Sequence, residues 1–300
     1  MKLWNKHIGL ALGGGGARGL THIGVLRVLE QEHIPIHIIA GTSIGSLVGG
    51  AYASGISPGE LEEKIQAYTG SPEFQDSVIH AISISHGQEP VGLTQKIQTF
   101  LKNKLYLIQM LLKPGIMSVN DFQSMINFFI PDIKIEDTHI PFRAIATDLV
   151  RGEKIVFSKG SMRQAIMASC AIPGAVEPLK DQERLLSDGG IISLIPISTV
   201  REAGADIIIA VAVDRDAFLY EELKTAKDIY YRASEITTNK LEKYELMDAD
   251  VVVRPDVKNI HWSDFSQVTD LIAEGEKATL EKLGEIRRNM PPFRRLLFRS

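Results

Sequence analysis

The sequence predicts an α/β fold with a mostly parallel sheet covered by helices. Short apolar runs alternate with longer amphipathic segments along the 300 residues, as in chains whose parallel strands are connected by helices. Hydrophobic residues make up 44% of the chain and charged residues 23%, which suffices for a large core. No repeat or low-complexity linker interrupts the alternation. We therefore expect one α/β domain, with or without an appendage.

The elements follow from the hydrophobic pattern, taken in chain order. The start is a β–α–β–α unit: a strand at residues 7–12, a helix at 17–32, a strand at 36–40 and a helix at 44–54. Further strands are expected at 142–149, 154–157, 184–187, 206–213 and 249–253, and further helices at 161–169, 196–203, 220–244 and 264–288. Residues 71–114 fit the alternation worst and end in a basic, apolar stretch at 100–113. We interpret them as an insertion into the α/β pattern, and their basic, apolar end is typical of a segment that meets a membrane.

Composition excludes several classes of protein. The net charge of -4 argues against nucleic acid as the main partner, since phosphate binding normally requires a basic excess. The single cysteine, Cys170, forms neither an intramolecular disulfide nor a CxxC metal pair, which fits a reducing, cytoplasmic compartment. The apolar run after Lys6 is too short for a signal-peptide core. The uncharged stretch 38–59 holds too many glycines and serines for a membrane-spanning helix.

A glycine-rich segment at residues 13–19 lies between the first expected strand and helix. Glycines there allow a sharp turn that points several N–H groups at one spot, and the helix N-terminus adds partial positive charge. Such a nest binds an anion. The pattern alone leaves open a dinucleotide pyrophosphate, the oxyanion of an acyl-transfer intermediate, or a purely structural turn.

Ser43 lies in a GxSxG pattern, between Gly41 and Gly45, where the second expected strand meets the next helix. This is the strand–turn–helix context of a nucleophile elbow, although an N-cap serine would look similar. Asp188, Gly189 and Gly190 follow the expected strand at 184–187, where the glycines leave the carboxylate uncrowded; an isolated Asp-Gly turn would read the same way.

Taken in order, these patterns resemble the three signature motifs of the patatin-like phospholipases, in particular the small bacterial members. The motifs are Gly14-Gly15-Gly16-Ala17-Arg18-Gly19, Gly41-Thr42-Ser43-Ile44-Gly45 and Asp188-Gly189-Gly190, and residues 168–174 resemble the stretch that precedes the third motif. The resemblance runs from about residue 8 to residue 201. It implies a patatin-like domain at 8–201 in a three-layer α/β/α sandwich, with residues 202–300 completing or flanking it and a basic tail at 287–300.

The same resemblance implies a serine lipid-acyl hydrolase with a catalytic dyad. Ser43 would be the nucleophile and Asp188 its base; the N–H groups of Gly14, Gly15 and Gly16 would form the oxyanion hole, and Arg18 would steady the loop or a lipid phosphate. The remaining motif residues would support these groups: Gly19, Gly41, Gly45, Gly189 and Gly190. No metal or cofactor is expected. The substrate would be a phospholipid, lysophospholipid or other acyl ester, and peripheral membrane contact and oligomeric state stay open.

Physical chemistry adds one requirement to this reading. An aspartate at its reference pKa of about 3.9 is a feeble base toward serine, so Asp188 must be partly desolvated or hydrogen-bonded to the hydroxyl. With no catalytic histidine, we also expect no histidine-like midpoint near 6.5 in the rate.

Three other kinds of protein share some of these patterns. A Rossmann dehydrogenase would want an acidic residue near the end of the second strand, and residues 36–41 offer none. A conventional Ser-His-Asp hydrolase would need a histidine after the acid, and only His261 has that order. A catalytically weak or inactive relative would keep the fold as a regulatory lipid-binding protein.

Overall fold

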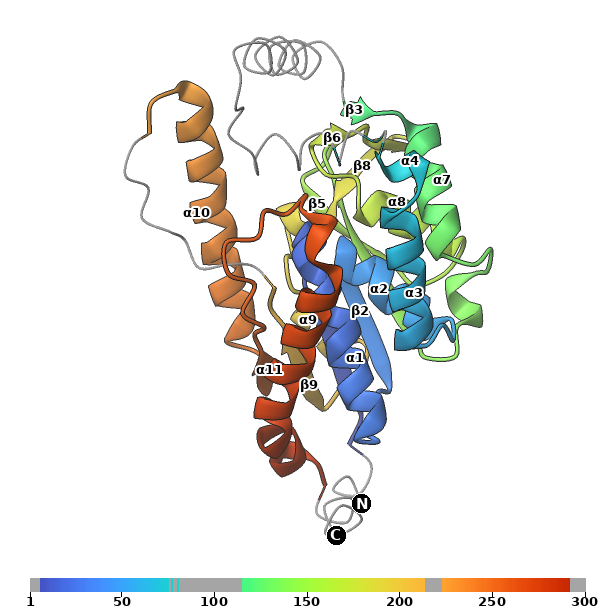
Figure 1. Cartoon of the computed structure of the whole chain (residues 1–300), viewed down its shortest axis with the longest axis vertical. Coiled ribbons are helices and arrows are strands. Elements are labelled where there is room, and N and C mark those ends of the chain that lie inside the picture. The colour runs from blue at the N-terminus through green and yellow to red at the C-terminus, as the bar shows by residue number, and fades with distance from the viewer. Residues whose placement is uncertain (1–5, 76, 78–79, 81–114, 214–222, 292–300) are drawn as a thin grey trace.

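The computed structural model describes residues 6–75, 77, 80, 115–213 and 223–291 (Figure 1). Its centre is an eight-stranded sheet in the order β10-β9-β1-β2-β4-β8-β7, with β5 also paired to β4. The strands are β1 Ile8–Leu12, β2 Ile38–Thr42, β4 Phe142–Asp148, β5 Glu153–Phe157, β7 Leu179–Asp181, β8 Arg184–Asp188, β9 Ile207–Val211 and β10 Val251–Val253. Two short strands, β3 Gly115–Met117 and β6 Gly174–Val176, pair separately.

The fold class is confirmed as α/β with a mixed, mostly parallel sheet. The pairs from β10 through β9, β1 and β2 to β4 are all parallel, whereas β5, β7 and β8 pair antiparallel to their neighbours. The helices are α1 Thr21–Gln31, α2 Ile44–Ala53, α3 Pro58–Thr69, α4 Pro72–Gln75, α7 Val119–Phe129, α8 Met162–Ser169, α9 Ile197–Glu202, α10 Ala226–Leu246 and α11 Val268–Asn289. Short 3-10 turns lie at Gly16–Leu20 (η1), Ile135–Asp137 (η2), Gly189–Ile191 (η3) and Phe265–Gln267 (η4).

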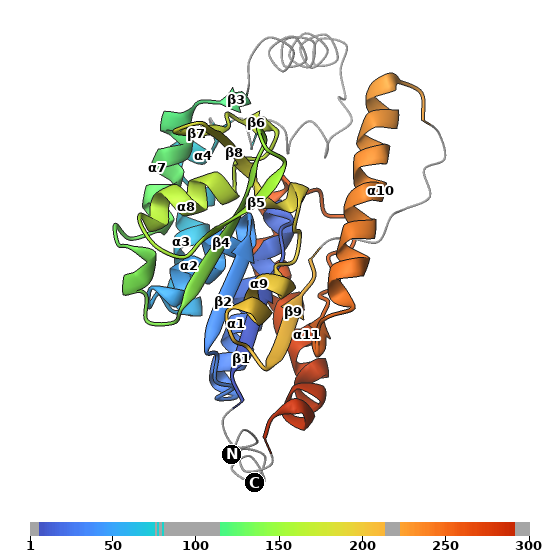
Figure 2. The same cartoon turned by 180° about the vertical axis from the view of Figure 1, so that it is seen from behind.

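The two faces of the sheet carry different cores. Large side chains such as Leu10, Leu12 and Ile39 lie in one cluster with α1, α2 and α11, while Ala11 and Ala40 lie in a second cluster with α9 and the end of α10. This alternation is what successive side chains of a strand produce. Helices therefore cover both faces, which Figures 1 and 2 show from opposite sides.

Several observed boundaries differ from the expected ones. The helix expected at 17–32 divides into η1 and α1, because Gly16 has a positive φ of 58° and starts a tight turn. The helix expected at 220–244 is α10, which begins at Ala226, and the one expected at 264–288 is α11, which begins at Val268 after η4. In the expected insertion at 71–114, Pro72–Gln75 forms α4; most of the remainder, including 100–113, lies outside the described residues.

The pairing of β4 brings two distant motifs together. β4 pairs with β2 through Ile145 and with β8 from Ala146 onward. Because β5 occupies the opposite edge of β4 over the same residues, β2 and β8 must share one edge. Asp188 is paired with Ala146, one position beyond the pair Thr42–Ile145, so β8 ends where β2 ends. The register therefore places Asp188 beside the turn that follows β2.

No helix in the described part of the chain is both long and apolar enough to cross a membrane.

Candidate active site

Ser43 occupies a strained turn between β2 and α2. Its φ of 54° and ψ of -126° lie outside the regions that a side-chain-bearing residue ordinarily adopts, as in a nucleophile elbow. The flanking glycines are required by packing: a Cβ on Gly41 would lie 2.3 Å from the Gly45 carbonyl oxygen, and one on Gly45 would lie 2.3 Å from that of Leu12. The Ser43 N–H donates to Ser169 Oγ at 3.0 Å, which fixes the turn from the α8 side.

Asp188 ends β8 and turns its carboxylate toward Ser43. The Ser43 hydroxyl lies within hydrogen-bonding reach of this carboxylate, and the Gly190 N–H donates to its Oδ1 at 2.7 Å. The Asp188 backbone is fixed as well, since Thr147 Oγ1 donates to its carbonyl at 2.8 Å. Gly189 must be a glycine, because a Cβ there would lie 2.4 Å from the Ile145 carbonyl oxygen.

Burial tunes the acid–base properties of Asp188. Only 7% of the residue is exposed, and desolvation raises its pKa to about 6 even though the hydrogen bonds from Ser43 and Gly190 lower it. The sequence-based requirement was that Asp188 be partly desolvated or hydrogen-bonded to the serine hydroxyl, and the structure shows the desolvation. Such a carboxylate is a stronger base than an exposed aspartate.

The glycine-rich loop presents fewer free donors than the sequence suggests. The Gly13 N–H donates to the Val211 carbonyl, and the Gly14 N–H donates to the Leu194 carbonyl at 3.0 Å. Gly14 therefore anchors the loop, which corrects its expected place among the oxyanion donors. The backbone hydrogen bonds of the described residues give no acceptor for the N–H groups of Gly15 and Gly16.

Two contacts hold the glycine loop in this shape. Gly16 takes a positive φ, and a Cβ there would lie 2.2 Å from the Trp262 carbonyl oxygen, so only glycine fits under the segment before α11. Arg18 is 9% exposed and its Nε donates to the Gly15 carbonyl at 3.2 Å. This hydrogen bond ties the Arg18 side chain to the backbone of the loop.

An apolar pocket opens at Ser43. Its lining comes from the turn after β2, from α2, α3, α4 and α7, and from the segments around residues 170–176 and 262–265. Aliphatic and aromatic side chains dominate, including Leu47, Tyr68, Phe122, Met125 and Phe129. A concave apolar site with a few polar groups at one end suits a lipid acyl chain.

Cys170 also lines the pocket, beside the nucleophile. Its thiol is within hydrogen-bonding reach of the hydroxyls of Ser43 and Ser46, the latter at 3.6 Å. Burial and the nearby Asp188 raise the pKa of the thiol, so it stays protonated.

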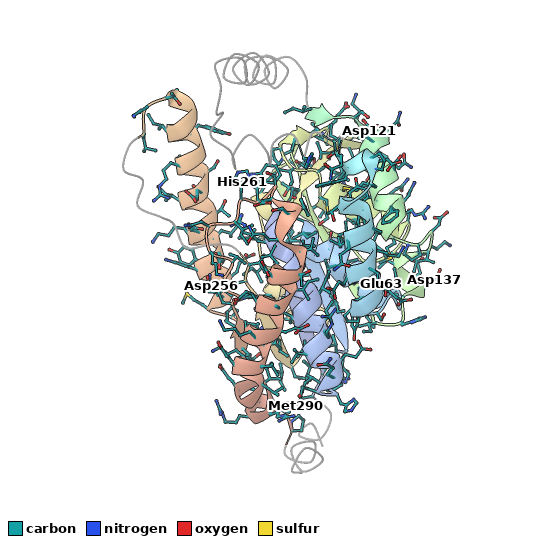
Figure 3. All side chains as sticks on the ribbon, viewed as in Figure 1. Glu63, Asp121, Asp137, Asp256, His261 and Met290 are labelled. Atoms are coloured by element: carbon teal, nitrogen blue, oxygen red, sulfur yellow. The ribbon has the colours of Figure 1, made fainter. Side chains whose placement is uncertain are left out.

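His261, the histidine that a Ser-His-Asp triad would need, is engaged elsewhere. Its Nδ1 lies 2.7 Å from Ser263 Oγ, and its ring packs against Trp262. Figure 3 labels His261 in the segment that leads into α11. None of the described residues that line the pocket is a histidine.

The sequence pointed to Ser43, Asp188 and the glycine turns, and the structure brings them together. The sequence did not point to Ser169, Cys170 or the segment 193–195. These residues lie outside the three motifs but contact them. The only available signal was the position of Ser169 and Cys170 in the stretch ahead of the third motif. Within the described residues, no group of three or more His, Cys, Asp or Glu side chains is placed to hold a metal ion.

Comparison with known proteins agrees with this geometry. Residues 10–201 match the family described as patatin-like phospholipase. An uncharacterized NTE family protein of Mycobacterium bovis is 34% identical over 210 residues, which are 70% of this chain and 50% of that protein. Patatin-like phospholipase domain-containing protein 7 of the mouse is 33% identical over 70% of this chain and 14% of its own length.

Two further similarities extend over most of the chain. Lysophospholipase NTE1 of Kluyveromyces lactis is 26% identical over 91% of this chain and 19% of its own length. The chain thus spans half or less of these curated relatives. The crystal structure of VipD from Legionella pneumophila superposes with a TM-score of 0.52 at 14% identity, covering 93% of this chain and 67% of that one. At this identity the likeness concerns the fold alone.

Proposed function

Because this chain belongs to the patatin-like phospholipase family, we propose that it is a serine lipid-acyl hydrolase that cleaves acyl esters with a Ser43–Asp188 dyad. The observation that carries the proposal is the position of Ser43, which lines an apolar pocket and lies within hydrogen-bonding reach of the buried Asp188 carboxylate. A nucleophile, its base and a lipid-compatible cavity are thereby in one place.

The proposed reaction passes through an acyl-enzyme. Asp188 takes the hydroxyl proton as Ser43 Oγ bonds to the acyl carbon, and the N–H groups of Gly15 and Gly16 stabilise the oxyanion. The protonated Asp188 then gives its proton to the departing alcohol oxygen as the ester C–O bond breaks. Water next attacks the acyl carbon, loses a proton to Asp188, and releases the fatty acid while Ser43 Oγ regains the proton.

The pocket favours a substrate with a long acyl chain. Its lining is almost entirely apolar away from Ser43, so burying a hydrocarbon chain there is favourable by about 0.8 kcal/mol per CH₂ group. Phospholipids and lysophospholipids both supply such a chain, and the yeast relative carries the name lysophospholipase.

We also propose a cytoplasmic location at the membrane periphery, which rests on the single cysteine and the basic tail of the sequence.

A fluorophosphonate probe tests the nucleophile directly. The probe should label the parent protein, and Ser43→Ala should abolish labelling together with release of fatty acid from lysophospholipid, while circular dichroism stays unchanged. Ser54→Ala is the matched control, because Ser54 caps the other end of α2 and its Oγ donates to the Ala51 carbonyl. Labelling that persists in Ser43→Ala would sink the assignment, and a folded parent protein that neither labels nor turns over any lipid would favour the regulatory alternative.

A further inference from the structure

A short segment after the third motif contacts all three motifs of the site. Thr42 Oγ1, one residue before the nucleophile, donates to the Ser193 carbonyl at 2.9 Å. The Gly14 N–H donates to the Leu194 carbonyl at 3.0 Å, and the Ser193 N–H donates to the Gly189 carbonyl at 2.9 Å. We call residues 193–195 the buttress segment. Its position fixes the spacing between the glycine loop, the turn that carries Ser43 and the turn that carries Asp188.

Side-chain packing strengthens the same connection. A Cβ built on Gly14 would lie 3.3 Å from Leu194 Cδ1, and a Cβ built on Gly190 would lie 3.4 Å from the same atom. Leu194 is therefore packed between the first and third motifs, and all residues of the buttress segment are buried. Displacement of this segment would disturb both loops together, because close-packed interiors transmit small shifts.

One carboxylate, from the last turn of α10, holds the buttress segment. Glu245 Oε1 accepts a hydrogen bond from Ser193 Oγ at 2.6 Å, and its Oε2 accepts one from the Ile195 N–H at 2.8 Å. The carboxylate thus bridges both ends of the segment. Burial raises the pKa of Glu245, while the hydrogen bonds from the segment lower it, so these bonds offset part of the cost of burying a charge.

We propose that Glu245 is a positioning residue of the active site. Through the buttress segment, Glu245 sets the geometry of the dyad and of the glycine loop. This inference rests on the proposed function, because its readout is turnover by Ser43. Glu245 is not among the residues that line the pocket, and its carboxylate bonds to Ser193 and Ile195, so its removal should alter the alignment of reacting groups and leave the binding of the acyl chain intact. A misalignment of about 1 Å can cost on the order of 100-fold in rate.

Three substitutions at this position separate geometry from charge. Glu245→Gln keeps the length of the side chain: its oxygen can accept from the Ile195 N–H, and its amide can donate to Ser193 Oγ. Glu245→Asp keeps the charge but is one methylene shorter and cannot bridge both ends. Glu245→Ala removes both contacts. We expect kcat near the parental value for the glutamine variant, and kcat lowered by on the order of 10- to 100-fold for the aspartate and alanine variants, with KM nearly unchanged.

The measurement uses a soluble monomeric ester, with active sites counted by stoichiometric fluorophosphonate labelling so that kcat refers to competent molecules only. Glu242→Ala is the matched control: this glutamate is also on α10 and buried, but its carboxylate pairs with Arg254 at 2.7 Å. It should lower stability without lowering kcat per titrated site.

The outcomes are decisive for this role. An alanine variant with parental kcat per site, or an aspartate variant more active than the glutamine variant, would overturn it while leaving the proposed function standing. If the alanine variant does not fold, the order of the glutamine and aspartate variants decides. If turnover instead persists in the Ser43→Ala variant, the proposed function is refuted, and the role of Glu245 with it.

Discussion

At the scale of single residues, the base in the proposed mechanism is a buried aspartate whose environment shifts its pKa. Burial raises the pKa of Asp188 to about 6, so the carboxylate is ionised at neutral pH yet still basic enough to take a proton.

His22 is completely buried on α1 and donates from Nε2 to the Gly13 carbonyl at 2.8 Å, and burial lowers its pKa to about 4. His22 is therefore a neutral support of the glycine loop.

This residue-scale balance predicts the pH dependence of turnover. The value of kcat/KM should rise with pH through a midpoint near 6 as Asp188 loses its proton. The sequence led us to expect no histidine-like midpoint near 6.5, but a value of about 6 lies too close to that figure for the midpoint to discriminate. Temperature does discriminate, because carboxyl ionisation has little enthalpy and imidazole ionisation has much. A midpoint that falls markedly on warming would point to a histidine as the base.

The raised pKa also predicts that Asp188 reduces stability. Because its folded pKa lies above the unfolded value, its contribution is most favourable below about pH 4 and is lost as pH rises through about 6. Asp188→Asn should therefore raise the free energy of unfolding at pH 8 by on the order of 2–3 kcal/mol, while abolishing turnover. The gain should shrink toward pH 4. Urea unfolding of both proteins across this range checks the prediction, and an equal gain at all pH values would contradict it.

At the scale of elements, the sequence predicts the strands and motif turns better than their lateral contacts. The β–α–β–α start and the position of Ser43 follow from local patterns. That β8 runs antiparallel and continues the edge of β4 where β2 ends depends on pairing between residues far apart in the chain, which no local pattern encodes. The contacts of Glu245 with residues 193–195 have the same long-range character.

The η3 turn allows an element-scale test of this register. In Gly189→Ala, the new Cβ would lie 2.4 Å from the Ile145 carbonyl oxygen, so the turn must move and carry Asp188 with it. We expect kcat to fall by on the order of 100-fold. Gly59→Ala is the control: a Cβ at this position in α3 meets nothing within 4 Å, and alanine favours the helix by roughly 0.5–1 kcal/mol. Turnover by Gly189→Ala at the parental rate would refute the register argument.

At the scale of the whole molecule, residues beyond the family match belong to the same body. The match ends at residue 201, yet β9 and β10 extend the central sheet and α11 packs along α1. Ile286 and Met290 are 1% exposed, and Arg287 pairs with Glu32. The first part of the expected basic tail is therefore the end of α11, in contact with the body, and residues 292–300 lie outside the described residues.

These contacts decide how membrane binding by the tail should be tested. Removal of everything after Glu285 would expose the core, whereas truncation after Pro291 removes Phe293, Arg294, Arg295, Leu296, Leu297, Phe298 and Arg299 and spares α11. Each arginine near an anionic surface contributes about 1 kcal/mol, so the three together correspond to on the order of 100-fold in vesicle affinity. We expect the truncated protein to sediment far less with anionic vesicles while it hydrolyses a soluble ester at the parental rate.

A variant with glutamine at Arg294, Arg295 and Arg299 separates charge from apolar insertion, because it keeps Phe293, Leu296, Leu297 and Phe298. If charge dominates, this variant should bind anionic vesicles as weakly as the truncated protein, and raising the salt concentration should weaken the parent in the same way. If it binds as well as the parent while truncation still abolishes binding, the apolar residues carry the attachment. Undiminished binding by the protein truncated after Pro291 would show that another surface meets the lipid.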